Sequence, residues 1–149
     1  MSTFQPEGVK IELNGEERHL LWDFGVIEKV QEKYGGHPIV VIKSIFWEEN
    51  GLRCYMAKPL LDIMEILLNN EVARDKYFNG SSSLKTYKRS ELGFLINREN
   101  ANVIVPAIVE SWVGSNPDAE TDEDEEDPEE ETEEETPKNV KSGKRTQKR

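Results

Sequence analysis

The apolar residues of this chain become rare after position 116, and this boundary limits what can fold. Of 53 apolar residues among 149, only Ala119 and Val140 lie beyond it. Residues 1–116 are about 44% apolar, which is ordinary for a packed domain. Residues 117–149 have too little apolar surface to offset the entropy lost on ordering, so we expect them to be disordered. The sequence therefore predicts one small globular domain, residues 1–116, followed by an unstructured tail.

The predicted tail holds most of the charge imbalance. The full chain has a net charge of −11. Residues 117–137 contain 14 acidic and no basic residues, whereas residues 138–149 contain six basic and no acidic residues. We interpret the acidic run as a hydrating, repulsive segment that keeps the domain or a bound protein in solution. A mimic of the regular negative charge of DNA is the alternative interpretation.

Cysteine content and hydropathy indicate the compartment. Cys54 is the only cysteine, so an intramolecular disulfide is excluded and a reducing compartment is favoured. The first residues contain no apolar signal-peptide core, and no apolar run approaches the roughly 18 residues of a membrane span. We therefore expect a soluble, intracellular protein with no membrane partner.

A β-hairpin is predicted near the N-terminus. Residues 9–13 alternate between apolar and polar side chains, which is typical of a half-buried strand. The core-facing residues are Val9, Ile11 and Leu13. The Asn14-Gly15 pair tolerates the positive φ angles of a two-residue turn. A second strand over about residues 18–22 should therefore pair back on the first.

An amphipathic helix is predicted to follow this hairpin. Asp23 is the expected N-cap, because its carboxylate can accept hydrogen bonds from the free amides of a first turn. Gly35-Gly36 ends the helix through a left-handed position, and Pro38 prevents its continuation. Helical spacing places four apolar residues on one expected core face. They are Phe24, Ile27, Val30 and Tyr34.

Residues 39–57 fit two alternatives. The Asn50-Gly51 pair between two apolar segments is typical of a second hairpin. The stretch "IVVIKSIFW" does not alternate, however, and a short buried helix explains its composition equally well. We favour a helix over residues 39–46 and keep the hairpin as the alternative.

Three further helices are predicted in the second half of the body. Pro59 suits the first turn of a leucine-rich helix, whose pattern breaks at Arg74 before an exposed loop marked by Gly80 and three serines. Ser90 is the expected N-cap of the next helix. Pro106 is expected near the first turn of the last helix. The core stripe of the leucine-rich helix comprises Leu60, Ile63, Met64, Leu67 and Leu68.

These elements predict an α+β fold. An N-terminal β-hairpin packs on a small bundle of about four helices, and a disordered acidic and basic C-terminal tail follows. The first helix is short and amphipathic and needs a partner surface to be stable, so we expect it to pack on the rest of the body.

The body contains no recognisable pattern of catalytic, cofactor-binding or metal-binding residues. His19 lies on a predicted strand and His37 precedes a proline, and neither belongs to a set of residues with metal-ligand spacing. Cys54 has no histidine near it in the sequence, so an inert thiol is favoured over a nucleophile. No glycine-rich phosphate loop with its lysine occurs. We therefore predict that the protein is not an enzyme and needs no cofactor or metal.

One loop has the composition of a weak nucleic-acid binder. It combines the cations Lys85, Lys88 and Arg89 with Tyr87, which could neutralise phosphates and stack on bases. Three cations on a body of net charge −3 give a small electrostatic footprint, so a solvated loop is the favoured interpretation. Within the basic C-terminal run, attraction to the neighbouring acidic run is favoured over attraction to nucleic acid.

The segment "ELNGEERHLLWDFGVIEKVQEKYGG" resembles the tail assembly chaperones of long-tailed, siphovirus-like bacteriophages and prophages. Ile27-Glu28 occupies the place of a hydrophobic–Glu pair in that family, and Tyr34 and Gly35 match an aromatic or aliphatic residue before glycine. The leucine-rich helix, the segment "SELGFLINREN" with its expected serine cap, and a charged C-terminal extension occur in a similar order. The resemblance covers about residues 8–116.

The resemblance implies a non-enzymatic role in the cytoplasm of the bacterial host. Such a protein binds and solubilises the tape-measure protein and helps to recruit tail-tube subunits, and self-association is a further expectation. Some members occur as a short form and a longer, frameshifted form, and this sequence fits either. Aromatic residues are enriched at protein interfaces, so the candidate client-binding residues are Trp22, Phe46, Trp47 and Trp112. The alternative function is a nucleic-acid-related factor, either a DNA mimic through the acidic run or a binder through the basic C-terminus.

Overall fold

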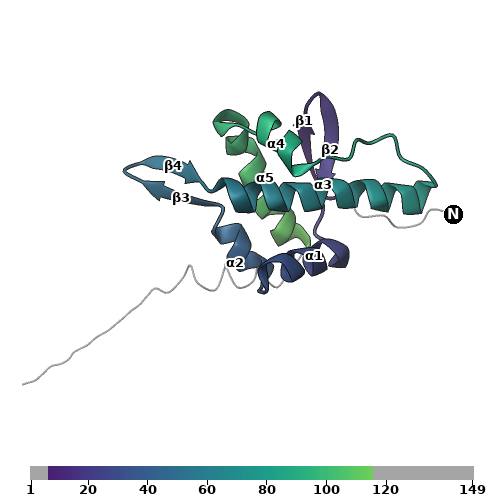
Figure 1. The fold of residues 1–149 in the computed structure, drawn as a ribbon, viewed down its shortest axis with the longest axis horizontal. Helices are drawn as coiled ribbons and strands as arrows, with labels where there is room; N and C mark the ends of the chain where they lie inside the picture. The colour runs from purple at the N-terminus through teal and green to yellow at the C-terminus, as the bar shows by residue number, and fades with distance from the viewer. Residues whose placement is uncertain (1–6, 116–149) are drawn as a thin grey trace, which may run out of the picture. The chain divides into compact units, whose positions relative to one another are not determined.

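The computed structural model describes residues 7–115 (Figure 1). The predicted charged tail lies outside these residues, so its disorder stays a prediction. The elements in order are β1 (Val9–Leu13), β2 (Glu16–Leu20), α1 (Phe24–Tyr34), α2 (Pro38–Lys43), β3 (Phe46–Glu49), β4 (Leu52–Tyr55), α3 (Ala57–Asn79), α4 (Arg89–Leu95) and α5 (Arg98–Ser115). The described part of the chain thus has two antiparallel hairpins and five helices, and the predicted α+β fold is confirmed.

The first hairpin forms where the alternation predicted it. Asn14 and Gly15 have φ angles of 56° and 76°, and the register pairs Leu13 with Glu16 directly across this two-residue turn. The second strand therefore begins two residues earlier than expected. Arg18 pairs with Ile11 and lies on the inner face of the hairpin, where it is fully buried.

Helix α1 has the predicted caps but a different buried face. The Val26 amide donates to the Asp23 carboxylate at 3.0 Å, and Gly35 ends the helix with a φ of 71°. The buried residues are Val26 and Val30, whereas Phe24 is 86% exposed. The predicted core face of α1 is therefore wrong at Phe24, because the helix is rotated relative to the body from the orientation that periodicity suggested.

Both alternatives for residues 39–57 are partly correct. Helix α2 begins at Pro38 behind His37, whose ring nitrogen accepts a hydrogen bond from the Ile39 amide at 3.2 Å. It ends at Lys43. The β3–β4 hairpin follows, and Asn50 and Gly51 form its turn with φ angles of 55° and 79°.

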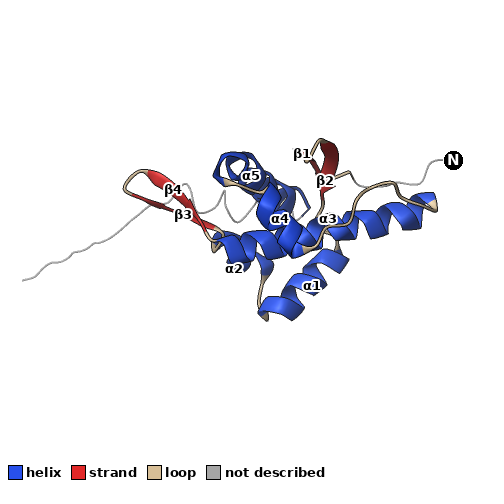
Figure 2. Ribbon diagram, turned by 45° about the horizontal axis from the view of Figure 1, so that its top comes forward, coloured by secondary structure: helices blue, strands red, loops and turns tan. Residues whose placement is uncertain are grey.

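Helix α3 is the central element of the fold, and its predicted apolar stripe is confirmed as buried. It packs against α1, α4 and β2 (Figure 2). The expected break at Arg74 is wrong, since the helix continues to Asn79 and ends at Gly80, which has a φ of 84°. Most of the side chains in these last turns are solvent-exposed, so no apolar stripe marked them in the sequence.

The two C-terminal helices begin at other positions than predicted. Ser90 is not the N-cap of α4, which starts at Arg89 with the Lys88 amide donating to the Glu91 carboxylate at 2.8 Å. Pro106 lies in the interior of α5 rather than near its first turn. It is on the exposed face, where water can hydrate the carbonyl of Asn102 that loses its helical donor.

Helix α5 closes the core by packing on β1, β2 and α2. Trp22 and Trp112 meet there edge to face, with ring centroids 5.2 Å apart and an interplanar angle of 85°. His37 also contacts the Trp112 ring, at 5.6 Å between centroids. Within residues 7–115, no helix combines the length and apolarity that crossing a membrane would require.

Candidate protein-binding site

An apolar groove opens to solvent between β4, the first turns of α3 and α5, and α4. Its volume is about 270 Å³. The residues that form its apolar walls are Tyr55, Ala57, Leu60, Leu61, Gly93, Ile96 and Ala101. Pockets for small ligands commonly enclose roughly 300–1,000 Å³, so this groove has room for a few side chains of a bound segment rather than for a large cofactor.

The sequence builds this groove through a missing side chain and a fixed turn. A Cβ atom at Gly93 would meet Leu61 Cδ1 at 3.9 Å, so the absence of a side chain in α4 leaves the space above Leu61 open. Asn97 and Asn100 each accept a backbone hydrogen bond from the other, at 2.8 and 2.9 Å. The Asn100 amide group also donates to Leu95 O at 2.8 Å. These contacts hold α4 and α5 at the angle that creates the groove.

The groove has an exposed apolar surround and one cation. Met56 and Phe94, neighbours in sequence of lining residues, are 48% and 88% exposed. Among the lining residues within 7–115, Arg98 is the single charged one, and its Nη1 donates to Arg53 O at a long 3.5 Å. The arrangement therefore suits an apolar segment of a partner protein.

The four aromatic residues proposed from the sequence do not form one surface. Trp22 and Trp112 are 2% and 4% exposed and pack against each other in the core. Phe46 and Trp47 lie on successive positions of β3, so their side chains point to opposite faces of the hairpin. Trp47 is 42% exposed. The structure thus leaves Trp47, and in part Phe46, accessible to a partner.

Sequence reasoning missed the groove residues because they are scattered over four elements. Leu61 and Ile96 lie half-buried at the border of the core, and neither belongs to the apolar stripe that helical spacing identified. The one available signal was Gly93, a helix-weakening residue inside a predicted helix. Such a glycine often marks a close approach or an open space.

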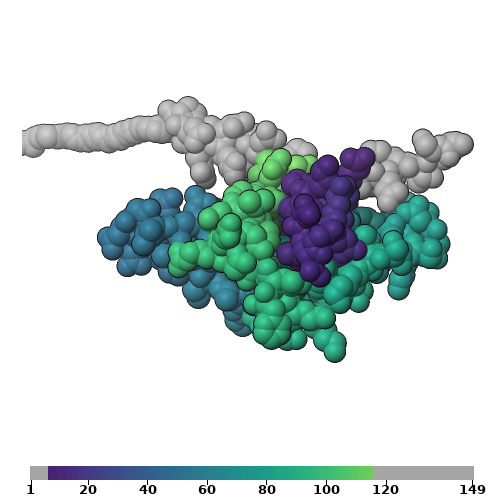
Figure 3. All heavy atoms as spheres, turned by 90° about the horizontal axis from the view of Figure 1, so that it is seen from above, coloured from purple at the N-terminus to yellow at the C-terminus, as the bar shows by residue number. Residues whose placement is uncertain are grey.

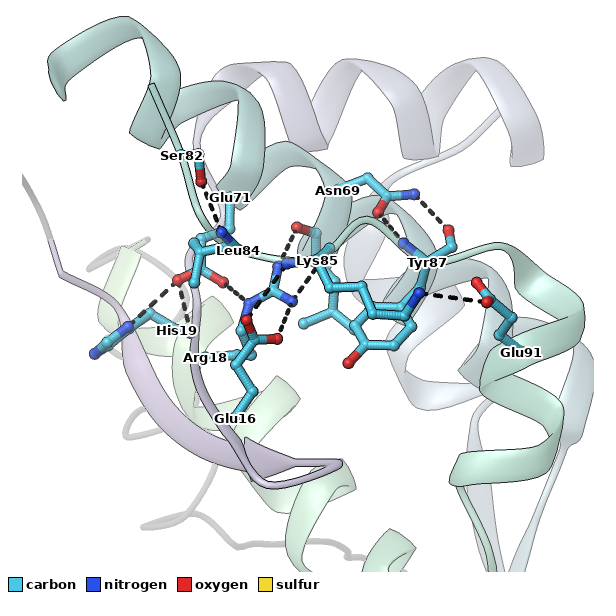
Figure 4. Close-up of polar contacts among 11 residues, drawn as sticks. Glu16, Arg18, His19, Asn69, Glu71, Ser82, Leu84, Lys85, Tyr87 and Glu91 are labelled. Atoms are coloured by element: carbon cyan, nitrogen blue, oxygen red, sulfur yellow. Dashed lines mark hydrogen bonds and ion pairs between the residues drawn. The ribbon is translucent and has the colours of Figure 1, made fainter. Parts of the chain in front are cut away.

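A buried ionic network joins β2, α3 and the loop before α4 (Figure 4). Arg18 donates to the Glu71 carboxylate at 2.7 Å and to Leu68 O at 2.7 Å. It also donates to Lys85 O at 2.9 Å. The second carboxylate oxygen of Glu71 accepts from the His19 backbone amide at 3.1 Å. The network pairs the two buried charges, Arg18 and Glu71, with each other and with further hydrogen-bond partners. It therefore has a structural role, in which β2 and the loop are held against α3.

A polar cavity of about 760 Å³ lies beside this network. Lys10, His19 and Arg74 contribute to its walls together with Glu17 and Asp75. His19 Nδ1 lies 3.3 Å from the Glu71 carboxylate. Arg74 is paired at 3.3 Å with the carboxylate of Asp23, the N-cap of α1. Its walls thus mix both signs of charge, and several of them are already engaged within the fold.

A second buried carboxylate, Asp62, gathers cations at the start of α3. Its side chain is 1% exposed and accepts hydrogen bonds from Arg89 at 2.6 Å and Lys58 at 3.0 Å. The Tyr34 hydroxyl is a third donor. Burial by itself would raise the pKa of Asp62, but these three hydrogen bonds outweigh it and lower the pKa to about 2. Burial and the contact with Asp62 raise the pKa of Tyr34.

The basic loop is largely engaged in the fold. Tyr87 is only 3% exposed, and its backbone exchanges two hydrogen bonds of 2.8 Å with the Asn69 side chain. Arg89 pairs with Asp62, and Lys85 pairs with Glu91 at 3.4 Å. A buried tyrosine cannot stack on a base, so this arrangement does not favour nucleic-acid binding by the loop.

The residues considered for metal binding or nucleophilic catalysis lie apart. His19 is on β2, His37 caps α2, and Cys54 is a half-buried free thiol on β4. Within the described residues, no group of three or more histidine, cysteine, aspartate or glutamate side chains could hold a metal ion.

Comparisons with models of protein families, with curated proteins and with solved structures found no match for this chain.

Proposed function

We propose that this chain is a non-enzymatic tail assembly chaperone of a long-tailed bacteriophage or prophage. In this proposal it binds the tape-measure protein, keeps it in solution and helps to recruit tail-tube subunits in the host cytoplasm. The family resemblance of residues 8–116 motivates the assignment. The observation that carries it is the apolar groove bounded by α3, α4 and α5, which is open to solvent.

The groove fits the recognition of an amphipathic helix. In that binding mode, apolar side chains at helical spacing enter a hydrophobic groove on the partner. Leu60, Leu61 and Ile96 would contact the apolar stripe of the client, and Arg98 would pair with a carboxylate beside that stripe. The 14 acidic residues in 117–137 would then repel neighbouring complexes and keep them dispersed.

Filling the groove should abolish binding while leaving the fold intact. Gly93 is helical, and a side chain at this position points into the groove, so Gly93→Leu would occupy the space of the client. Burying one or two client side chains contributes about 1.5–3 kcal/mol each, so affinity for the tape-measure protein encoded in the same genome should fall at least about tenfold, enough to abolish binding at the concentrations of the assay. Light scattering during co-refolding should show the client aggregating despite an excess of the variant.

Gly114→Leu is the matched control, because Gly114 is also helical and a Cβ atom there meets no atom of the described part of the chain within 4 Å. Both leucines raise helix propensity, by roughly 0.8–1 kcal/mol relative to glycine, so neither variant should unfold. If Gly93→Leu protects the client as well as Gly114→Leu does, the groove is not the binding site. If the wild-type chain itself leaves aggregation of the tape-measure protein unchanged, the proposed function is wrong.

A further inference from the structure

The β3–β4 hairpin lies at one end of the described body and has no neighbouring strand on either side (Figures 1 and 3). An isolated two-stranded hairpin is at best marginally stable in water. An uncovered strand edge is also a template for pairing with another chain.

The hydrogen-bond pattern identifies the backbone groups that point outward. The Met56 amide donates to Ile45 O at 2.6 Å, so this pair at the base of the hairpin is hydrogen-bonded. Bonded and non-bonded pairs alternate along an antiparallel ladder. Phe46 and Glu48 lie one and three residues further along β3 and belong to non-bonded pairs. Their N–H and C=O groups therefore point away from β4.

The two edges differ in what covers them. On the β4 edge, Arg98 of α5 donates to the carbonyl of Arg53 at 3.5 Å. On the β3 edge, no hydrogen bond from elsewhere in residues 7–115 reaches the outward backbone groups of Phe46 and Glu48. The β3 edge is thus the open one.

The two faces of the hairpin differ as well. Trp47 and Leu52 share a face with Cys54 and are 42% and 64% exposed. On the other face, the Arg53 guanidinium lies 5.1 Å from the centre of the Phe46 ring, so that ring is covered within the hairpin. An added strand would find its uncovered apolar surface on the Trp47 side.

The charge of β3 decides which strand fits. Glu48 and Glu49 are both exposed, and β3 contains no basic residue. Within the described residues, the one ionic contact of Glu48 is with Arg53, at 3.6 Å. A second copy of β3 pairing with the first would bring carboxylates close together, and like charges directly opposite one another are destabilising. The complementary strand is therefore basic.

We propose that the β3 edge binds an extended basic segment of another protein as a third strand. The backbone of this segment would pair with the outward groups of Phe46 and Glu48. Because side chains alternate along a strand, its apolar residues would cover Trp47 while its Lys or Arg residues face Glu48. The site is separate from the apolar groove and does not depend on the proposed function.

A blocked heptapeptide of alternating lysine and valine is the probe, added to the full-length protein. At saturation, amide hydrogen exchange measured by NMR should slow at least about tenfold at Phe46 and Glu48, because both amides become hydrogen-bonded. Acrylamide quenching of tryptophan fluorescence should also decrease. Trp22 and Trp112 are buried, so the quenchable emission reports on Trp47.

The acidic run of residues 117–137 will attract any cationic peptide, so the controls separate charge from strand pairing. The same peptide with its central lysines and valines N-methylated keeps its charge but loses the backbone donors on both of its edges, and it should give no protection. Glu48→Lys should weaken the effect of the lysine peptide about fivefold and admit an alternating glutamate–valine peptide. Glu48→Pro should abolish strand addition while keeping the hairpin, since the lost N–H points outward.

Three results would overturn the proposal. They are unchanged exchange at Phe46 and Glu48 at peptide saturation, equal protection by the N-methylated peptide, and protection of both amides in the protein alone. Gly93→Leu should leave the peptide effect unchanged, so the groove and the strand edge can fail independently.

Discussion

Replacement of Arg18 by methionine is expected to lower the free energy of unfolding by roughly 3–5 kcal/mol, the usual cost of removing one partner of a buried ion pair. Arg18 is fully buried, and Glu71, its partner at 2.7 Å, is 6% exposed. The variant leaves the Glu71 carboxylate buried without its cation. It also removes the donor to Leu68 O in α3 and to Lys85 O in the following loop.

Urea denaturation followed by circular dichroism and tryptophan fluorescence would measure this loss. The double variant Arg18→Met, Glu71→Leu should recover part of it, because no unpaired carboxylate stays buried. The hydrogen bonds to Leu68 O, Lys85 O and the His19 amide remain lost. Lys10→Met, on the exposed face of the same hairpin, should change stability by no more than about 0.5 kcal/mol. A loss below about 1 kcal/mol for Arg18→Met would mean that the network does not hold the hairpin.

The network explains how the N-terminal hairpin is attached to the helices. One guanidinium reaches a side chain and a carbonyl of α3 and a carbonyl 67 residues away in the chain. Apolar packing of Ile11 and Leu13 is non-directional, whereas these hydrogen bonds specify one position of β2 along α3. Arg18 also donates to the Lys85 carbonyl, and this contact holds the loop predicted after Gly80 against the hairpin at that point.

Much of the local structure could be predicted because local physics decides it. Asn14-Gly15 and Asn50-Gly51 both adopt the positive φ angles that two-residue turns require. Asp23 and Gly35 likewise cap α1 through contacts with residues three or four positions away. The alternation in β1 and the two-residue turn together also predict where Arg18 lies, because they place it opposite Ile11 on the buried face of the hairpin.

The surface could not be predicted, because distant contacts decide it. Asp23 accepts hydrogen bonds from Asn70 at 2.8 and 3.0 Å, and this contact across 47 residues helps to set the orientation of α1 on α3. Phe24 is exposed as a result, although its spacing fits a core face. Trp22 and Trp112 are buried for an analogous reason, since each covers the other. The groove is assembled from four elements, and a single glycine inside a helix, Gly93, is its one local signature in the sequence.

The second large effect is expected at Asp62 and depends on pH. The folded-state pKa of Asp62 is about 2, compared with an ordinary value of 3.8. One pKa unit corresponds to about 1.4 kcal/mol, so the ionised carboxylate contributes about 2–3 kcal/mol. Because the folded pKa is depressed, this contribution is fully present above pH 3.8 and is lost as the pH falls through about 2. Arg89, Lys58 and Tyr34 are the groups that stabilise the charge.

Asp62→Asn should therefore destabilise the protein by about 2–3 kcal/mol at pH 6, and the difference from the wild type should shrink steadily below pH 3.8. Urea midpoints measured from pH 6 down to pH 2 would test this. Tyr34→Phe removes one of the three donors and should give a smaller loss with the same pH dependence. Glu110→Gln removes an exposed carboxylate of α5 and should change stability by no more than about 0.5 kcal/mol at pH 6. A difference between Asp62→Asn and the wild type that stays constant down to pH 2 would show that packing of the carboxyl group, rather than its charge, stabilises the start of α3.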